Sequence, residues 1–107
     1  MPLYVLIGTD GSEAPERRKQ ARPGHLAYWQ PLDMKGLVRF GGPLLDADGT
    51  PRGSVLVFEA VDLQAARAQA DGDPYVTEGV FGQVEVHETR AVFPSAPTSS
   101  ATAPPRQ

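Results

Sequence analysis

The stretch "PLYVLIG" (residues 2–8) is a short, continuous apolar run rich in β-forming side chains, and the turn-prone "TDGS" follows it. This pattern predicts a β-strand. Side chains alternate between the two faces of a strand, so the run divides into two sets. Leu3, Val5 and Ile7 fall on one face, and Tyr4 and Leu6 fall on the other. Both faces are apolar and both need cover, whereas one layer of helices covers only one of them.

The segments that follow complete an alternation of strands and helices. They predict a helix over 12–36, strands over 37–45 and 54–60, and a helix over 63–72 that Asp62 caps. A loop or short turn is predicted over 73–81 and a strand over 82–93. This order predicts an α+β fold, namely a ferredoxin-like βαββαβ sandwich with an antiparallel four-stranded sheet and two helices on one face. We expect the other face, carrying Tyr4 and Leu6, to be left for a partner.

Prolines interrupt the predicted helix over 12–36. Ser12 can cap its N-terminus, and Pro23 is expected to end one helical piece before a second begins. Pro31 lacks an amide hydrogen and is expected to kink the second piece. Gly36 is expected to stop the helix.

Length and composition bound the class of protein. The 107 residues suit one small domain, which we place at residues 1–93. Residues 94–107 are rich in Pro, Ser and Thr without apolar periodicity, which predicts a flexible C-terminal tail. No signal peptide and no membrane span is recognisable, so we expect a soluble cytoplasmic protein with no membrane partner. The chain has no cysteine, which excludes disulfides, thiolate metal sites and a cysteine nucleophile.

The charge of the chain argues against nucleic acid as a partner. The net charge is −3, and no basic stretch is interleaved with aromatic residues. The one basic cluster follows two glutamates and is expected to be the solvated face of a helix. It comprises Arg17, Arg18, Lys19 and Arg22.

His25 stands out because it falls within the apolar stripe of the predicted helix. Leu26, Trp29 and Leu32 repeat every three residues, and His25 lies within roughly 40° of the centre of that stripe. One interpretation is a buried histidine with a hydrogen-bond partner. The other is a general base whose tautomer is fixed by a carboxylate. Three aspartates could supply that carboxylate: Asp10, Asp33 and Asp73.

Other kinds of chemistry have less support in the sequence. His25 and His87 are the only imidazoles and are not at helical spacing, so we expect no metal site. No glycine-rich phosphate-binding motif and no serine-nucleophile elbow is present, and we expect no cofactor. The glycines of "FGGP" (40–43) either let the backbone come close to a ligand or to another chain, or mark a bulge in an edge strand.

Several motifs, taken in order, resemble the YCII-related (YciI-like) proteins. They are "LYVLIGTD", "ARPGHLAYWQ", "GGPLLDADG", "GSVLVFEAVDLQAARAQADGDPYVTEGVFGQVEV" and "AVF", and the resemblance covers residues 3–93. It implies a ferredoxin-like homodimer related to the dimeric α+β barrels. It also implies a site built on a His–Asp pair, here His25 and Asp73. The positions that match the family motifs around this pair are Asp10, Arg22, Gly42 and Ser54.

The activity linked to that family is elimination of chloride from a chlorinated, hydroxylated aromatic without a cofactor. The resemblance therefore implies a cofactor-independent lyase or isomerase that acts on a small aromatic or enolisable substrate through His25 and Asp73. Pro31 and the short segment between "GGP" and "GS" depart from the family pattern, which bears on the identity of the substrate. The alternative is a non-catalytic small-molecule-binding or partner module, because a fold does not determine function. An oxygen-using monooxygenase on the same barrel is a third possibility.

Overall fold

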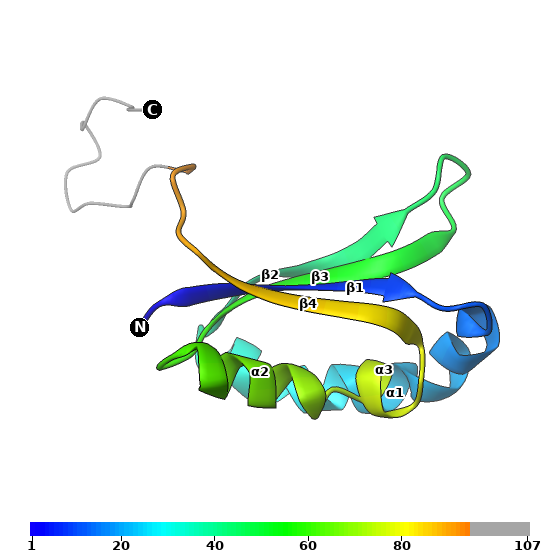
Figure 1. Ribbon diagram of the computed structural model, residues 1–107, viewed down its shortest axis with the longest axis horizontal. Coiled ribbons are helices and arrows are strands. Elements are labelled where there is room, and N and C mark those ends of the chain that lie inside the picture. The colour runs from blue at the N-terminus through cyan, green and yellow to red at the C-terminus, as the bar shows by residue number, and fades with distance from the viewer. Residues whose placement is uncertain (95–107) are drawn as a thin grey trace.

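The computed structural model describes residues 1–94, and their elements follow the predicted order (Figure 1). They are β1 (Leu3–Asp10), α1 (Ala14–Met34), β2 (Val38–Leu45), β3 (Pro51–Glu59), α2 (Leu63–Asp71), α3 (Pro74–Thr77) and β4 (Phe81–Thr89). The short α3 lies where the sequence predicts a loop or short turn, and β4 ends at Thr89 rather than at Phe93. The predicted tail, residues 94–107, lies outside the described residues apart from Pro94.

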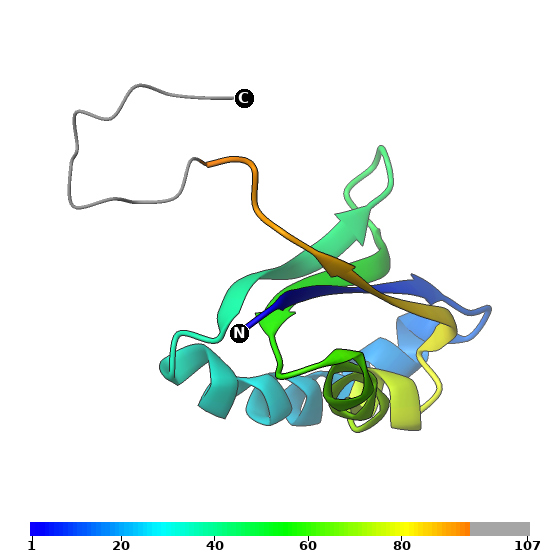
Figure 2. The ribbon, with the colours of Figure 1, turned by 60° about the vertical axis from the view of Figure 1, so that its left-hand side comes forward.

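The four strands form one antiparallel sheet in the order β2-β3-β1-β4. All three helices lie on one face of this sheet, as the two views agree (Figure 1, Figure 2). The predicted α+β, ferredoxin-like βαββαβ fold is confirmed. Among the described residues, no helix is both long enough and apolar enough to cross a membrane.

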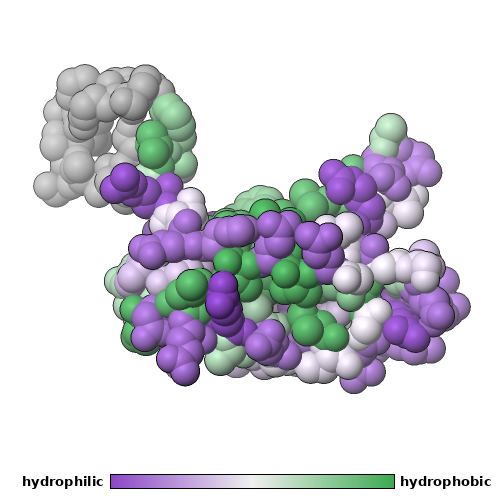
Figure 3. Space-filling model, viewed as in Figure 1, coloured by the Kyte–Doolittle hydropathy of each residue, from purple (hydrophilic) through white to green (hydrophobic). Residues whose placement is uncertain are grey.

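The helices cover the sheet face that the sequence analysis assigned to a partner. Tyr4 and Leu6 are almost fully buried, and they pair across the sheet with Phe58 and Leu56. Trp29 of α1 packs edge-on against Phe58, with ring centroids 5.1 Å apart. Apolar residues accordingly gather between the sheet and the helix layer (Figure 3). The prediction of the face was wrong because both sets of β1 side chains are apolar, and only packing against β3 and α1 distinguishes them.

The helix α1 is continuous through both of its internal prolines, so the division predicted at Pro23 is wrong. Pro23 and Pro31 each remove one amide donor, which deprives the carbonyls of Lys19 and Ala27 of their helical partners. All four residues are exposed, so water can reach those carbonyls. The helix persists because this cost falls on its solvated side while the opposite side packs on the sheet.

The predicted helix ends are confirmed in part. Ser12 is not a cap: α1 begins after Glu13 without a side-chain cap, because the amide of Ala14 already donates to a backbone carbonyl in the preceding turn. Gly36 adopts a φ of 76° just beyond α1, where it stops the helix as predicted. Asp62 caps α2 as predicted, accepting a 2.8 Å hydrogen bond from a backbone amide.

The opposite face of the sheet is apolar at its centre, and no helix of residues 1–94 covers it (Figure 1). Its central side chains are partly exposed and come from the neighbouring strands β1 and β3: Leu3, Val5, Ile7, Val55 and Val57. A small domain has a thin margin of stability and gains from burying such a surface. We propose that a second copy of the chain covers this face.

Val57→Asp should convert the expected dimer into a monomer, because it places a charge between Val5 and Phe40 in the proposed interface. Ala68→Asp, on the exposed side of α2, is the matched control. In sedimentation equilibrium at micromolar concentration, the native protein and the control should have about twice the 11.5 kDa chain mass. A native protein that sediments as a single chain would overturn the proposed dimer.

Candidate active site

A pocket of about 740 Å³ lies between α1 and the β2–β3 hairpin. One wall is the side of α1 from Arg18 to Asp33, the other is formed by β2 and β3, and Tyr75 of α3 contributes to the lining. Of the six site residues that the family resemblance implies, four line this pocket: Arg22, His25, Gly42 and Ser54.

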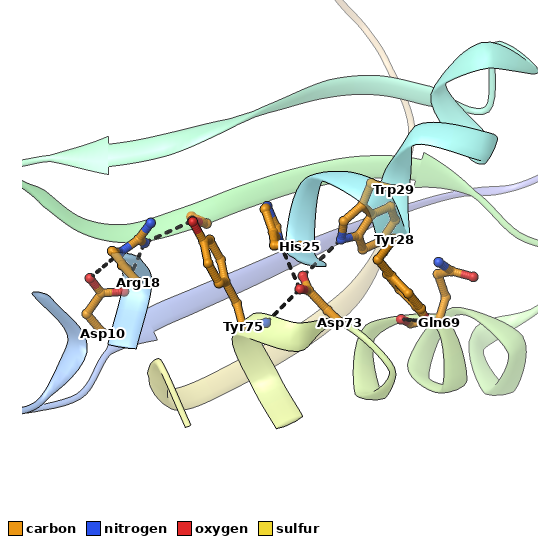
Figure 4. Close-up of polar contacts among 9 residues, drawn as sticks. Asp10, Arg18, His25, Tyr28, Trp29, Gln69, Asp73 and Tyr75 are labelled. Carbon is orange, nitrogen blue, oxygen red and sulfur yellow. Dashed lines mark hydrogen bonds and ion pairs between the residues drawn. The ribbon is translucent and has the colours of Figure 1, made fainter. Parts of the chain in front are cut away.

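Asp73 is fully buried beside the pocket, and its carboxylate has three hydrogen-bond partners (Figure 4). Its Oδ1 atom lies 2.7 Å from Nδ1 of His25 and accepts from the amide of Tyr75 at 2.8 Å. Its Oδ2 atom accepts from the indole Nε1 of Trp29 at 2.9 Å. These three contacts offset the cost of burying a carboxylate.

The chain around Asp73 holds the carboxylate in place through local backbone geometry. Gly72 ends α2, Asp73 is the N-cap of α3, and Pro74 takes the first helical position. A residue before proline is driven to extended backbone, and Asp73 has a φ of −66° and a ψ of 127°. Gly24 of α1 lies next to Pro74 of α3, at a distance where a Cβ atom would make an ordinary van der Waals contact.

The contact with Asp73 determines which nitrogen His25 presents to the pocket. An ionised carboxylate only accepts hydrogen bonds, so Nδ1 of His25 carries the proton in the neutral imidazole. Nε2 then has a free lone pair, is not sequestered from solvent, and has no hydrogen-bond partner among the described residues. The imidazole is therefore arranged to accept a proton from a molecule in the pocket.

Arg18 turns into the pocket, although the sequence analysis placed it on a solvated helix face. Its Nε and Nη2 atoms donate to the two carboxylate oxygens of Asp10 at 2.8 and 3.0 Å. Nη2 also donates to Oγ of Ser54 at 3.0 Å and to the carbonyl of Gly53 at 2.8 Å. Burial alone would lower the pKa of Arg18, but the hydrogen bond and the charge of Asp10 outweigh burial and raise it. Arg18 therefore supplies a permanent positive charge.

The ring of Tyr75 lies between the side chains of His25 and Arg18. The imidazole of His25 stacks on its ring, with centroids 3.8 Å apart and planes inclined by 7°. The guanidinium of Arg18 lies 4.9 Å from the centroid of the same ring. Figure 4 shows the phenol ring between Arg18 and His25. The ring separates the two side chains, and its π-electrons interact favourably with a cation on either face.

The other predicted residues differ in how they contribute to the pocket around His25. Ser54 lines the pocket and contacts Arg18, whereas Arg22 lies on the exposed part of the lining. Gly42 contributes backbone to the wall, and a Cβ there would point toward the ring of Phe40. Asp10 is absent from the lining and instead holds Arg18.

Two further candidates from the sequence do not join the His25 centre. Asp33 lines the pocket but makes no contact with His25, whose partner is Asp73. His87 is exposed and pairs with Glu85 at 3.0 Å on β4. Within residues 1–94, no group of three or more histidine, aspartate or glutamate side chains is placed to hold a metal ion.

Sequence reasoning missed Arg18, the hydrogen bond of Trp29 and the position of Tyr75. A signal for Arg18 exists, because Arg18, Arg22, His25 and Trp29 follow one another at intervals of four, three and four residues. That spacing places them on one side of a helix, the side that lines the pocket. Tyr75 comes from a separate segment, and no spacing within the sequence connects it to α1.

Comparison with known proteins places the chain in a family. The profile of the YCII-related domain matches residues 2–90. The chain belongs to this family. Protein YciI of Escherichia coli and protein YciI of Shigella flexneri are each 37% identical over 97 aligned residues, and each match covers 85% of this chain and 99% of theirs. An uncharacterized protein of Haemophilus influenzae is 31% identical over 96 aligned residues, and the match covers 84% of this chain and 98% of that one.

Solved structures share the fold of this chain. The 5-chloro-2-hydroxyhydroquinone dehydrochlorinase of Burkholderia phenoliruptrix, in complex with 2,5-dihydroxybenzoquinone, is 28% identical with a TM-score of 0.74. The match covers 82% of this chain and 93% of that one. An antibiotic biosynthesis monooxygenase is 14% identical with a TM-score of 0.52, covering 85% of this chain and 98% of that one, and this likeness concerns the fold alone.

Asp73→Asn should lower the free energy of unfolding by about 2–3 kcal/mol. The side-chain NH₂ group of asparagine is itself a donor, so it would face one of the three present donors and that hydrogen bond would be lost. Asp71→Asn, an exposed position two residues earlier, is the control. Urea denaturation followed by circular dichroism measures both. A loss below about 0.5 kcal/mol, typical of a surface substitution, would contradict the assigned hydrogen bonds.

Proposed function

We propose that this YCII-related protein is a cofactor-independent lyase or isomerase that moves protons on a small hydroxylated aromatic or enolisable substrate. The observation that carries the proposal is the orientation of His25. Its Nδ1 is held 2.7 Å from the buried carboxylate of Asp73, which leaves Nε2 available to the pocket. The likeness to a dehydrochlorinase at 28% identity supports elimination as the type of reaction.

In this proposal His25 is the general base and then the general acid. Nε2 takes a proton from a substrate hydroxyl or an acidic carbon, and the imidazolium that forms is stabilised by the charge of Asp73. The oxygens of Asp73 also accept from the indole of Trp29 and the amide of Tyr75, which hold the carboxylate in position beside His25. A base positioned in this way contributes about 10²–10⁴-fold in rate.

Arg18 and Ser54 are suited to stabilise negative charge that develops on a substrate oxygen. Asp10 fixes the guanidinium before substrate arrives, so little reorganisation is needed during the reaction. The hydroxyl of Ser54 accepts a hydrogen bond from Arg18, which leaves its own proton free to be donated to the substrate. In this proposal Asp10 is a positioning residue, and Arg22 and Gly42 contact the more distant part of the substrate.

An elimination in this pocket balances without an oxidant or a reductant. On a halogenated hydroquinone, a proton moves from one hydroxyl to the ring carbon that bears the halide, and the ring becomes a ketone tautomer. His25 then removes the second hydroxyl proton, the O–H electron pair forms a new carbonyl bond, the ring double bond at that carbon shifts toward the carbon that bears the halogen, and the C–halogen electron pair leaves with the halide. The net change is loss of one hydrogen halide, and a quinone remains.

His25→Ala should reduce chloride release from 5-chloro-2-hydroxyhydroquinone by at least about 10²-fold per folded molecule, because the general base is lost. His87→Ala removes the other, exposed histidine and should leave the rate unchanged. Chloride release and the folded fraction are measured on the same samples. If the activity of His25→Ala only follows its folded fraction, His25 is a structural residue and the catalytic role is wrong.

Asp73→Asn combined with His25→Ala should be little slower than His25→Ala alone, because groups that act as one unit have non-additive effects. Multiplicative losses would contradict the pairing. A native protein that binds the chlorinated substrate but releases no chloride would favour the alternative function, a small-molecule-binding module on the same fold.

A further inference from the structure

Two cations of the pocket take no part in the proposed proton transfer. Lys19 and Arg22 line the pocket from α1 and are exposed, and neither forms an ion pair within the described residues. Arg18 differs from them, because it forms an ion pair with the carboxylate of Asp10. The exposed end of the pocket therefore carries two positive charges whose electric field is not cancelled by a paired side chain.

The rest of the lining supplies no nearby negative charge. The side chains that β2 and β3 contribute are all uncharged, and Asp33 is the one carboxylate among the lining residues. Asp33 lies about 16 Å beyond Arg22 along α1, at 1.5 Å of rise per residue. The chain as a whole has a net charge of −3, so this positive surface contrasts with the overall charge of the protein.

The two cations lie close to the proposed base. Lys19, Arg22 and His25 follow one another at three-residue intervals on α1. Helix residues three apart are neighbours, with about 5–6 Å between their Cβ atoms. A single six-membered ring spans such a step, so one ring can place a hydroxyl at Nε2 of His25 and a second substituent at Arg22.

We infer that the substrate carries a carboxylate and that Arg22 and Lys19 bind it. The preferred substrates are then hydroxylated monocyclic acids, which bind more tightly than phenols that lack the carboxylate. The guanidinium of Arg22 can hold the carboxylate through two parallel hydrogen bonds, and Lys19 adds a second charge. This inference rests on the proposed function, because the position of His25 sets the orientation of the ring.

The test compares 2,5-dihydroxybenzoate with hydroquinone, two ligands that differ only in the carboxylate. Isothermal titration calorimetry of the full chain should give a dissociation constant about tenfold lower for the acid. A hydrogen bond between charged groups contributes about this much to affinity. Lys19→Gln combined with Arg22→Gln should abolish that difference and leave the affinity for hydroquinone unchanged. Arg67→Gln, an exposed α2 arginine outside the pocket lining, is the control for loss of positive charge.

The possible outcomes separate this inference from the proposed function. Equal affinity for the two ligands, or an equal loss of acid binding in Arg67→Gln, overturns the carboxylate subsite and leaves the role of His25 intact. Acid binding that depends on Arg22, together with full activity per folded molecule in His25→Ala, supports the subsite and overturns the catalytic role. If neither ligand binds at millimolar concentration, both proposals are wrong.

Discussion

The carboxylate of Asp73 joins parts of the chain that are far apart in sequence. His25 and Trp29 reach it from α1, and the amide of Tyr75 reaches it from the start of α3. Because Asp73 is fully buried, each of these donors replaces a hydrogen bond that water would otherwise make. The contact therefore fixes α1 against α3 and at the same time fixes the imidazole, so the stability of the fold and the arrangement of the site share one interaction.

The remaining polar groups are arranged around the ring of Tyr75. Arg18, paired with Asp10, lies over this ring as a cation, and His25, the proposed proton-transfer group, stacks on the same ring. A proton acceptor and a fixed cation near one pocket are what a reaction through an oxyanion needs. The fold provides both because one side of α1 faces the β2–β3 hairpin across the pocket.

The sequence predicts the element order well, because strand and helix periodicities are local properties. It also places His25 in an apolar helix stripe and Asp73 before a proline, and the family resemblance pairs them. Which face of β1 the helices cover is not predictable from its own alternation, since Tyr4 and Val5 are both apolar. Arg18 was misjudged because a run of basic residues is usually solvated, whereas here Asp10, from a separate segment, compensates its burial.

The tautomer of His25 tests the central claim most directly, because it reports whether Asp73 fixes the imidazole. The chain has only two histidines, so long-range proton–nitrogen correlation NMR of nitrogen-labelled protein, with His87→Gln for assignment, resolves the ring of His25. We predict that neutral His25 is protonated at Nδ1 with Nε2 unprotonated, and that Asp73→Asn weakens this preference. A neutral His25 protonated at Nε2, or a tautomer unchanged by Asp73→Asn, would contradict the account.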